Sequence, residues 1–323
     1  MSMLNDIKQG LRIPVIGAPL YIVSNPTMVI EQCKAGIIGS FPALNARPKN
    51  TLKSWITEIK HALDAHKQAN PGCSVAPFAV NQICHQTNTR LQHDMEICVE
   101  QQVPIIITSL RPPADVIKAV HGYGGMVMHD VVSIRHAEKA LEQGVDGLIA
   151  VTSGAGGHAG QINPFALITE IREIFDGPLA LSGSISTGDG ILAARALGAD
   201  FAYMGTRFIA SKESSASEDY KQMIMDCSAK DIVYTPAFTG VPANYMAPSI
   251  TDNGIDLADL AGINPGSLDL TNDEASFEDD TKPKAWLDIW SAGHGVGTIH
   301  NAPSIADIVN QLEKEYNRAR EQI

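Results

Sequence analysis

A histidine within a glycine-rich stretch is the residue of this sequence best suited to chemistry. His158 lies in the stretch Ser153–Gly160, which reads Ser-Gly-Ala-Gly-Gly-His-Ala-Gly and follows a hydrophobic run. Because glycine has no side chain, the backbone there can pass close to a flat ligand and aim the imidazole at it. Imidazole titrates near neutral pH and therefore suits proton transfer. The pattern predicts a catalytic role for His158, whereas most of the other histidines fit ordinary surface or core positions.

Two short stretches combine glycine with hydroxyl-bearing residues directly after hydrophobic runs. They are Ser182-Gly183-Ser184 and Met204-Gly205-Thr206. Glycine lets the backbone approach a phosphate closely, and serine and threonine hydroxyls add hydrogen-bond donors. In barrels of parallel strands, phosphate is frequently bound by the loops after the seventh and eighth strands. Both stretches follow those strands in the order predicted below, so we expect them to hold the phosphate of a cofactor.

Other kinds of site find little support in the sequence. His85, His129 and His158 show neither HxH nor HExxH spacing and no acid-rich partner spacing, so we expect no metal. The sequence has no GxSxG nucleophile motif, which argues against a serine hydrolase. The first predicted strand ends in Gly17–Leu20 rather than in GxGxxG. This difference argues against an open doubly wound sheet that binds a dinucleotide.

Short runs of β-branched and aliphatic residues alternate with longer amphipathic stretches between residues 14 and 207. Such alternation predicts parallel strands joined by crossover helices, and eight strands is the number that closes a barrel. We therefore predict an α/β fold, a (β/α)₈ TIM barrel. The predicted strands are Val15–Ala18, Ile37–Phe41, Pro77–Val80, Ile105–Ser109, Met126–His129, Gly147–Val151, Leu179–Ser182 and Phe201–Met204.

The alternation stops after Ser211, and this change predicts a second unit. Residues 214–284 are rich in Pro, Gly, Asn and Asp and show no strand–helix repeat. We predict that they form a small cap, inserted between the barrel segment 1–213 and a closing segment 285–323 that completes the barrel.

Within the predicted cap, three aromatic residues are candidates for substrate contact. They are Tyr234, Phe238 and Tyr245. In the closing segment, apolar residues at helical spacing follow Ser304, a residue type that often caps helix N-termini. This pattern predicts a helix over Ser304–Arg320.

Composition excludes some classes of partner. The formal net charge of −12 argues against nucleic acid, whose phosphates require a basic surface. It still allows an anionic cofactor, because backbone N–H groups bind phosphate without net positive charge. No stretch is long and apolar enough to cross a membrane, and the five cysteines form no CxxC pair. We therefore expect no membrane partner and a cytoplasmic location.

Taken together, the motifs resemble those of the nitronate monooxygenase family, formerly called 2-nitropropane dioxygenases. They are also similar to those of FMN-dependent NADH:quinone reductases and flavin enoyl-acyl-carrier-protein reductases. The stretches that carry the resemblance are Gly17–Leu20, Gly156–Gly160, Ser182–Ser184 and Gly205–Phe208, and Trp290–Gly293 is a further similar segment. The resemblance covers residues 10–210 and implies a barrel enzyme with FMN at its C-terminal mouth.

The resemblance also implies roles for individual residues. One set would lie along the flavin ring and a second set would surround the phosphate. The first set is Ala18, Pro19, Leu20, Asn81 and Gly156, and the second is Gly183, Ser184, Gly205 and Thr206. Ser182 and Met204, in the same two stretches, are also predicted to bind the cofactor. His158 matches the catalytic histidine of the family, which is the base that acts on nitroalkanes.

Two positions depart from relatives. The best-known bacterial monooxygenases have a glutamine where this chain has Val151, and some quinone-reductase-like relatives have a lysine where it has Asp130. A cation near the pyrimidine end of the flavin favours the anionic reduced form. Without that lysine, His129 or peptide N–H groups are the candidates for this task, so we add His129 to the predicted cofactor-binding residues.

The function implied by the resemblance is FMN-dependent oxidation of alkyl nitronates by O₂ to a carbonyl compound and nitrite. An alternative on the same scaffold is an NAD(P)H-dependent reductase of quinones or enoyl groups. A non-catalytic flavin-binding protein is an alternative of a different class, against which the presence of His158 argues. The expected partners are a small nitronate or quinone-like substrate and either O₂ or NAD(P)H, and a homo-oligomer is compatible with the sequence.

Overall fold

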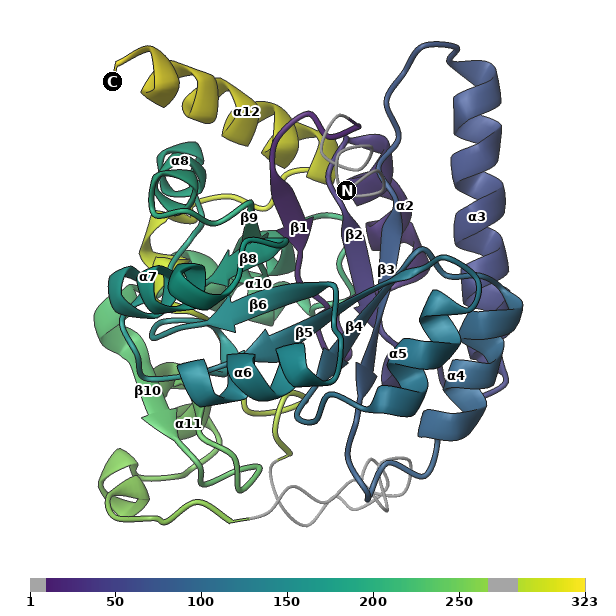
Figure 1. The fold of residues 1–323 in the computed structure, drawn as a ribbon. Coiled ribbons are helices and arrows are strands. Elements are labelled where there is room, and N and C mark those ends of the chain that lie inside the picture. The colour runs from purple at the N-terminus through teal and green to yellow at the C-terminus, as the bar shows by residue number, and fades with distance from the viewer. Residues whose placement is uncertain (1–9, 267–283, 323) are drawn as a thin grey trace.

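The computed structural model describes residues 10–266 and 284–322, and its centre is a sheet of parallel strands that closes into a barrel (Figure 1). The strand order is β1-β9-β8-β6-β5-β4-β3-β2. The first and last strands of this order meet through two hydrogen bonds, from Ile38 N to Val15 O (3.1 Å) and from Gly17 N to Ile38 O (2.8 Å). The predicted (β/α)₈ barrel is confirmed.

The eight barrel strands agree closely with the predicted ones. The largest difference is at the third strand, which continues to Ile83, three residues beyond its predicted end at Val80. The second strand begins at Gly39, after Ile37 and Ile38, and ends at Pro42. The strands are β1 (Val15–Gly17), β2 (Gly39–Pro42), β3 (Phe78–Ile83), β4 (Ile105–Ser109), β5 (Met126–Val131), β6 (Gly147–Val151), β8 (Leu179–Ser182) and β9 (Phe201–Met204).

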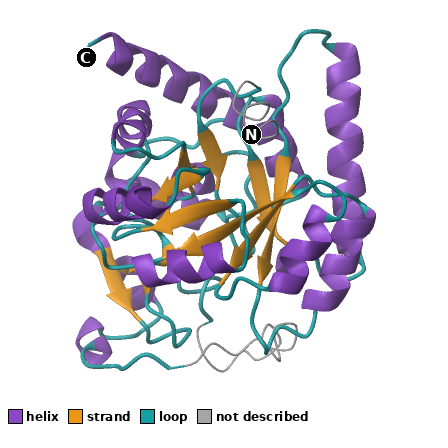
Figure 2. Ribbon diagram, in the orientation of Figure 1, coloured by secondary structure: helices purple, strands orange, loops and turns teal. Residues whose placement is uncertain are grey.

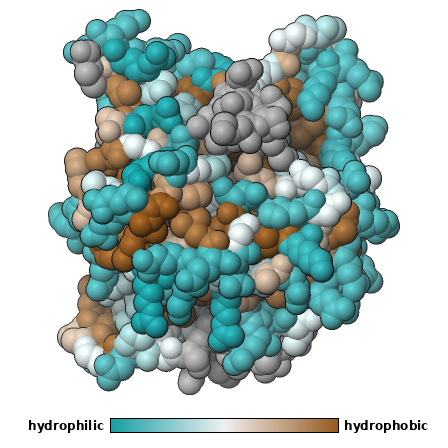
Figure 3. Space-filling view, viewed as in Figure 1, coloured by the Kyte–Doolittle hydropathy of each residue, from teal (hydrophilic) through white to brown (hydrophobic). Residues whose placement is uncertain are grey.

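Helices cover the outside of the barrel (Figure 2). They are α2 (Pro26–Lys34), α3 (Thr51–Ala69), α4 (Leu91–Glu100), α5 (Ala114–His121), α6 (Ile134–Glu142), α7 (Pro164–Ile174), α8 (Gly188–Ala196), α9 (Thr206–Ile209) and α12 (Ile305–Glu321). Several begin at a capping side chain, such as Asn25 for α2, Ser133 for α6 and Thr187 for α8. The predicted closing helix is α12, and Ser304 is its N-cap. Figure 3 shows that polar side chains cover most of the outer face on this side. None of the helices described is long and apolar enough to cross a membrane.

Side chains alternate between two buried layers along each barrel strand. One apolar layer fills the inside of the barrel, with residues such as Ile107, Met128 and Phe201. The other lies between the strands and the helices, with residues such as Ile106 and Val127. Since successive strand residues point to opposite faces, this alternation fixes which residues can reach the mouth of the barrel from inside.

The region after the eighth barrel strand contains a second, antiparallel sheet with the order β10-β11-β7. The elements of this region are α10 (Glu218–Asp226), η2 (Ala229–Asp231), β10 (Ile232–Thr235), β11 (Ala243–Met246), α11 (Ala247–Asp252) and η3 (Leu257–Leu260). A later turn, η5 (His294–Thr298), packs against α9, α10 and η2. The third strand of this sheet, β7 (Gly157–His158), comes from the barrel's glycine-rich loop. The predicted cap segment 214–284 extends to residues 267–283, which lie outside the described residues.

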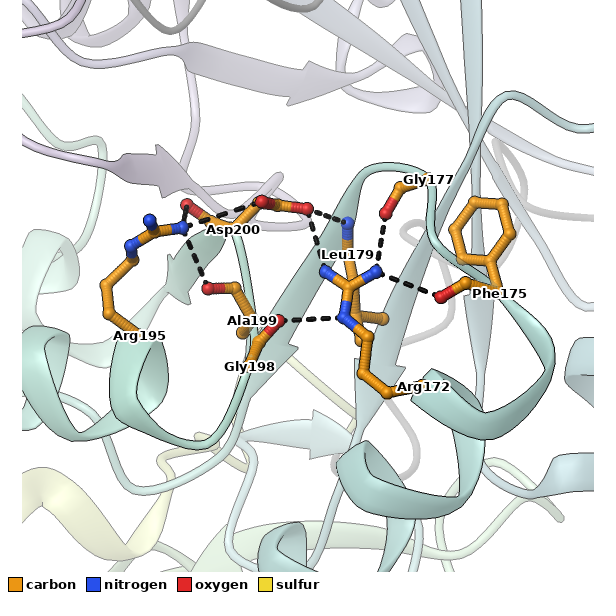
Figure 4. A network of polar contacts seen from close by, with 8 residues as sticks. All are labelled: Arg172, Phe175, Gly177, Leu179, Arg195, Gly198, Ala199 and Asp200. Carbon is orange, nitrogen blue, oxygen red and sulfur yellow. Dashed lines mark hydrogen bonds and ion pairs between the residues drawn. The ribbon is translucent and has the colours of Figure 1, made fainter.

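A polar network ties β8 and β9 together at the opposite end of the barrel from the mouth (Figure 4). Asp200 accepts hydrogen bonds from Arg172 Nη2 (2.8 Å) and from Leu179 N (3.0 Å), and Arg195 Nη1 lies 3.5 Å from its second oxygen. Arg172 also donates to the carbonyl of Gly177 at 2.7 Å. Polar groups at this end of a barrel serve stability.

A tight crossing joins α8 to the closing helix α12, and it generates a stability prediction. A Cβ atom on Gly188 would lie 2.3 Å from Tyr316 N and 2.5 Å from Leu312 O, which are backbone atoms that cannot move independently. We expect Gly188→Ala to force the helices apart and to lower the free energy of unfolding by about 1–3 kcal/mol, the usual cost of overpacking. Thermal unfolding followed by circular dichroism measures this loss.

Gly190→Ala is the matched control in the same helix, since its nearest contact would be the flexible Ile185 side chain at 3.3 Å. Alanine also has the higher helix propensity. Equal unfolding midpoints for the two variants would contradict the close-crossing argument.

Candidate active site

A cavity of about 1010 Å³ opens at the C-terminal ends of the barrel strands, the end at which barrel enzymes carry their active sites. It brings together eleven of the thirteen predicted site residues. These are Ala18, Pro19, Leu20, Asn81, Gly156, His158, Ser182, Gly183, Ser184, Gly205 and Thr206. Its volume is in the range of cofactor-binding pockets.

One corner of the cavity is built almost entirely from backbone. Gly154 O accepts hydrogen bonds from Ser184 N (3.2 Å) and His294 N (2.9 Å), and Gly293 N donates to Thr206 Oγ1 (2.9 Å). Gly183 adopts φ +141°, and a Cβ atom there would lie 2.4 Å from the hydroxyl oxygen of Thr152. Glycine-bearing segments from four parts of the chain therefore meet here, leaving room and hydroxyl groups for a phosphate. The sequence analysis did not assign the fourth segment, at Gly293–Gly295, to the site.

A polar cluster lies on the far side of the mouth, on β3, β4 and β5. Asn81 Nδ2 donates to Ser109 Oγ at 2.8 Å, and Asp130 accepts from Leu110 N at 3.4 Å. Burial raises the pKa of the Asp130 carboxyl to about 6, and a hydrogen bond with Ser109 partly opposes this shift. The cluster gives the cavity a second group of hydrogen-bonding side chains, on strands other than those that carry the glycine-rich corner.

Two predicted cofactor-binding residues do not line the cavity. His129 is 2% exposed and its Nδ1 lies 2.8 Å from Thr108 Oγ1, on the side of β5 that faces the helices. Burial lowers the pKa of His129 to about 4, so it is neutral at neutral pH and supplies no cation. The side chain of Met204 is fully buried in the layer between strands and helices. Its carbonyl oxygen accepts a hydrogen bond from Ala18 N, which belongs to a residue of the cavity wall. In both cases the neighbour along the strand, Asp130 or Tyr203, faces the cavity instead.

His158 reaches the cavity from a short strand rather than from a free loop. β7 pairs antiparallel with β11, with His158 opposite Ala243. The ring meets Trp286 edge-on at 5.5 Å between centroids, and its Nε2 lies 3.1 Å from Thr239 Oγ1. Burial lowers the pKa of His158 to about 4. The imidazole is therefore neutral at neutral pH and can accept a proton.

Two side chains hold the glycine-rich loop in place from the C-terminal half of the chain. Ser291 Oγ accepts from Gly157 N at 2.7 Å and donates to Asn244 O at 2.5 Å. Asn244 Nδ2 donates to Ala155 O at 2.6 Å. The sequence analysis missed both residues, because their role depends on contacts across more than eighty residues. The similarity of Trp290–Gly293 to relatives was the one available signal.

The predicted aromatic wall is partly correct. Tyr234 and Phe238 line the cavity, and Tyr234 donates a hydrogen bond to Ala159 O at 2.9 Å. Tyr245 is fully buried behind them, stacked on Trp286 at 5.2 Å between centroids. Trp286 takes its place at the cavity wall and was not predicted.

Both departures from relatives face the cavity. Val151 and Asp130 are lining residues on neighbouring strands β6 and β5. An apolar side chain and a carboxyl group therefore occupy the two positions for which the resemblance implies an amide or a cation. This part of the wall is less positive and less polar than the resemblance implies.

The comparisons with known proteins agree with this architecture. The family model described as nitronate monooxygenase matches residues 4–315. A nitronate monooxygenase of Paraburkholderia phytofirmans is 26% identical, over 97% of this chain and 95% of its own length. The structure of FabK from Thermotoga maritima superimposes with a TM-score of 0.79 at 25% identity, covering 100% of this chain and 98% of that one. A nitroalkane oxidase structure from Streptomyces ansochromogenes has the same fold, with a TM-score of 0.79 at 22% identity and 99% coverage of both chains.

The fold and these relatives define a flavin-dependent oxidoreductase built on a barrel. The chain belongs to the nitronate monooxygenase family, as the resemblance predicted.

The contacts of Ser291 generate a prediction about the glycine-rich loop. Ser291 is 7% exposed, and Ser291→Ala removes the partner of the half-buried Gly157 N–H and of the buried Asn244 C=O. We expect a loss of about 1–3 kcal/mol in the free energy of unfolding. We also expect faster hydrogen exchange in a peptide that spans Gly157. Differential scanning calorimetry and exchange mass spectrometry measure the two effects.

Ser54→Ala is the control, since Ser54 bonds only to Thr51 O on the exposed side of α3. We expect it to change stability by less than about 0.5 kcal/mol. Unchanged exchange around Gly157 in Ser291→Ala would show that the β7–β11 pairing alone holds the loop.

Proposed function

We propose that the protein binds FMN and oxidises alkyl nitronates with O₂, giving a carbonyl compound and nitrite. The observation that carries the proposal is the position of His158, a neutral imidazole in the wall of a cavity that also contains a phosphate-sized backbone corner. FMN bound there supplies the electron transfer between substrate and O₂.

The residues of the cavity fit FMN better than FAD. A single glycine-rich corner, from Gly183 and Ser184 to Gly205 and Thr206, suits one terminal phosphate held by backbone N–H groups and hydroxyls. The sequence carries no dinucleotide fingerprint for a second phosphate and a second nucleoside. The backbone of Ala18–Leu20 and the side chain of Asn81 would hold the ring.

His158 would act on neutral nitroalkanes as a general base. It takes the proton from the carbon that bears the nitro group, and the electron pair of that C–H bond stays on the substrate as the nitronate. Phe238 and Trp286 give this part of the cavity wall apolar surroundings, and the Trp286 ring contacts the imidazole directly. A nitronate supplied from solution needs no such base.

A second candidate is an NAD(P)H-dependent quinone or enoyl reductase. The FabK structure, from an enoyl reductase, has the same fold over the full chain and favours this alternative. The two functions differ in which compound reduces the flavin. Anaerobic mixing of the protein with NADH, NADPH and propyl 2-nitronate in turn distinguishes them, because only the true electron donor bleaches the flavin absorbance. Bleaching by none of them would favour a flavin-binding protein without turnover.

The first functional prediction concerns the cofactor. We expect the purified protein to be yellow and to release FMN when it is denatured by acid, because no covalent attachment is implied. Chromatography of the released flavin against FMN and FAD standards identifies it. Recovery of FAD would contradict the single phosphate corner as the complete cofactor site.

The second prediction concerns His158→Asn, which keeps a polar side chain but removes the titrating group. Turnover of a neutral nitroalkane should fall by about 10²–10⁴-fold, the usual contribution of a positioned acid–base group. Oxidation of a pre-formed nitronate should fall much less, because that substrate has already lost its proton. Steady-state oxygen consumption measures both rates, and FMN content should stay unchanged.

Equal losses on the two substrates would mean that His158 positions the ligand rather than taking a proton. Full activity on both would remove His158 from the mechanism altogether.

A further inference from the structure

The structure distinguishes the two ring nitrogens of His158. Nε2 lies 3.1 Å from the hydroxyl oxygen of Thr239. The same oxygen lies 3.0 Å from Val241 O and 3.3 Å from Val241 N. Thr239 stands in the turn between β10 and β11, so its hydroxyl is held by the backbone of the turn that follows it.

The proton of the Thr239 hydroxyl can be assigned by counting donors and acceptors. A hydroxyl has one proton to donate, and a backbone carbonyl can only accept. Val241 O therefore takes the hydroxyl proton, since otherwise two sets of lone pairs would face each other at 3.0 Å. The Tyr245 hydroxyl also interacts with Thr239, and because it has a proton of its own to donate, it does not need the Thr239 proton. The Thr239 oxygen is left as an acceptor for Val241 N–H and for the ring of His158. Nε2 must then carry a proton of its own.

A neutral imidazole carries one proton on its two nitrogens, and His158 is neutral because burial lowers its pKa to about 4. With that proton on Nε2, the lone pair that can accept a proton is on Nδ1. The edge-on contact with Trp286 limits rotation of the ring and supports a single orientation.

We propose that Thr239 is a positioning residue that holds His158 in its Nε2–H tautomer, so that Nδ1 is the atom that takes the substrate proton. The inference rests on the proposed function for its catalytic consequence, but the tautomer itself is a property of the protein. In the step, the substrate C–H bond breaks, the Nδ1–H bond forms, and the electron pair remains on the nitronate. The resulting imidazolium keeps its Nε2–H bond to Thr239, which supports the positive charge.

The test combines a spectroscopic measurement with two variants of Thr239. Thr239→Val has the same shape without the hydroxyl, and Thr239→Ser keeps the hydroxyl. Nitrogen-15 NMR of histidine-labelled, flavin-loaded protein reads the tautomer directly, and His158→Asn identifies the His158 signals by their absence. We expect wild type and Thr239→Ser to show a protonated Nε2 and a bare Nδ1, and Thr239→Val to lose this single tautomer.

Either of two spectra would overturn the proposal. One is a protonated Nδ1 in the wild type, and the other is an unchanged Nε2–H tautomer in Thr239→Val. The first needs no variant to fold, so the proposal stays falsifiable even if Thr239→Val is unstable.

Kinetics provide the second readout. Thr239→Val should lower kcat on a neutral nitroalkane by at least about tenfold with little change in KM, since a histidine in the wrong tautomer loses much of its catalytic effect. Thr239→Ser should restore the rate, and oxidation of a pre-formed nitronate should change little in both variants. Failure of the wild type to oxidise any nitro compound would contradict the proposed function, but it would not affect the His158 tautomer that NMR measures. If Thr239→Val changed the tautomer of His158 but not the rate with nitroalkanes, this would contradict the assignment of Nδ1 as the atom that takes the substrate proton.

Discussion

The alternation of side chains along the closed barrel decides which residues can take part in chemistry. Each strand has one set of side chains inside and one set against the helices, and a shift by one residue exchanges the two sets. Asn81, Ser109 and Asp130 face inward at the ends of three neighbouring strands and meet at the cavity wall. His129, one residue away from Asp130, belongs to the other set and pairs with Thr108. The register of the barrel strands therefore determines which strand residues line the cavity.

The conformation of the glycine-rich loop depends on a second constraint, which is its pairing with the segment that follows the barrel. A loop with four glycines among the eight residues Ser153–Gly160 has high conformational entropy, and nothing within it holds the imidazole in one place. The β7–β11 pairing, the bonds of Ser291 and Asn244, and the Thr239 contact all come from residues more than eighty positions further along the chain. The glycines admit the ligand, and the later segment supplies the rigidity that they lack.

The sequence was sufficient for the features that follow from local patterns. Alternating hydrophobic runs located all eight barrel strands, and Ser304 located the start of α12. The glycine and hydroxyl residues predicted to hold a phosphate line one cavity. It failed where one residue of register or a distant contact decides the outcome. His129 was assigned to the site in place of the lysine that the resemblance implies at Asp130, yet alternation along β5 directs His129 toward the helices and Asp130 toward the cavity. Trp286, Thr239 and Ser291 reach the site only through the folding of the C-terminal region, which has no repeating pattern to read.

The low pKa of His158 is consistent with its proposed role as a base. Burial lowers this pKa because an isolated imidazolium is poorly solvated in the cavity. Proton transfer from a neutral nitroalkane does not produce an isolated imidazolium, however, since the nitronate anion forms beside it at the same moment. Opposite charges in contact attract strongly where water is excluded, so the ion pair raises the basicity of the ring during the step. The same burial that keeps His158 neutral and ready to accept a proton thus strengthens the attraction that stabilises the products of the transfer.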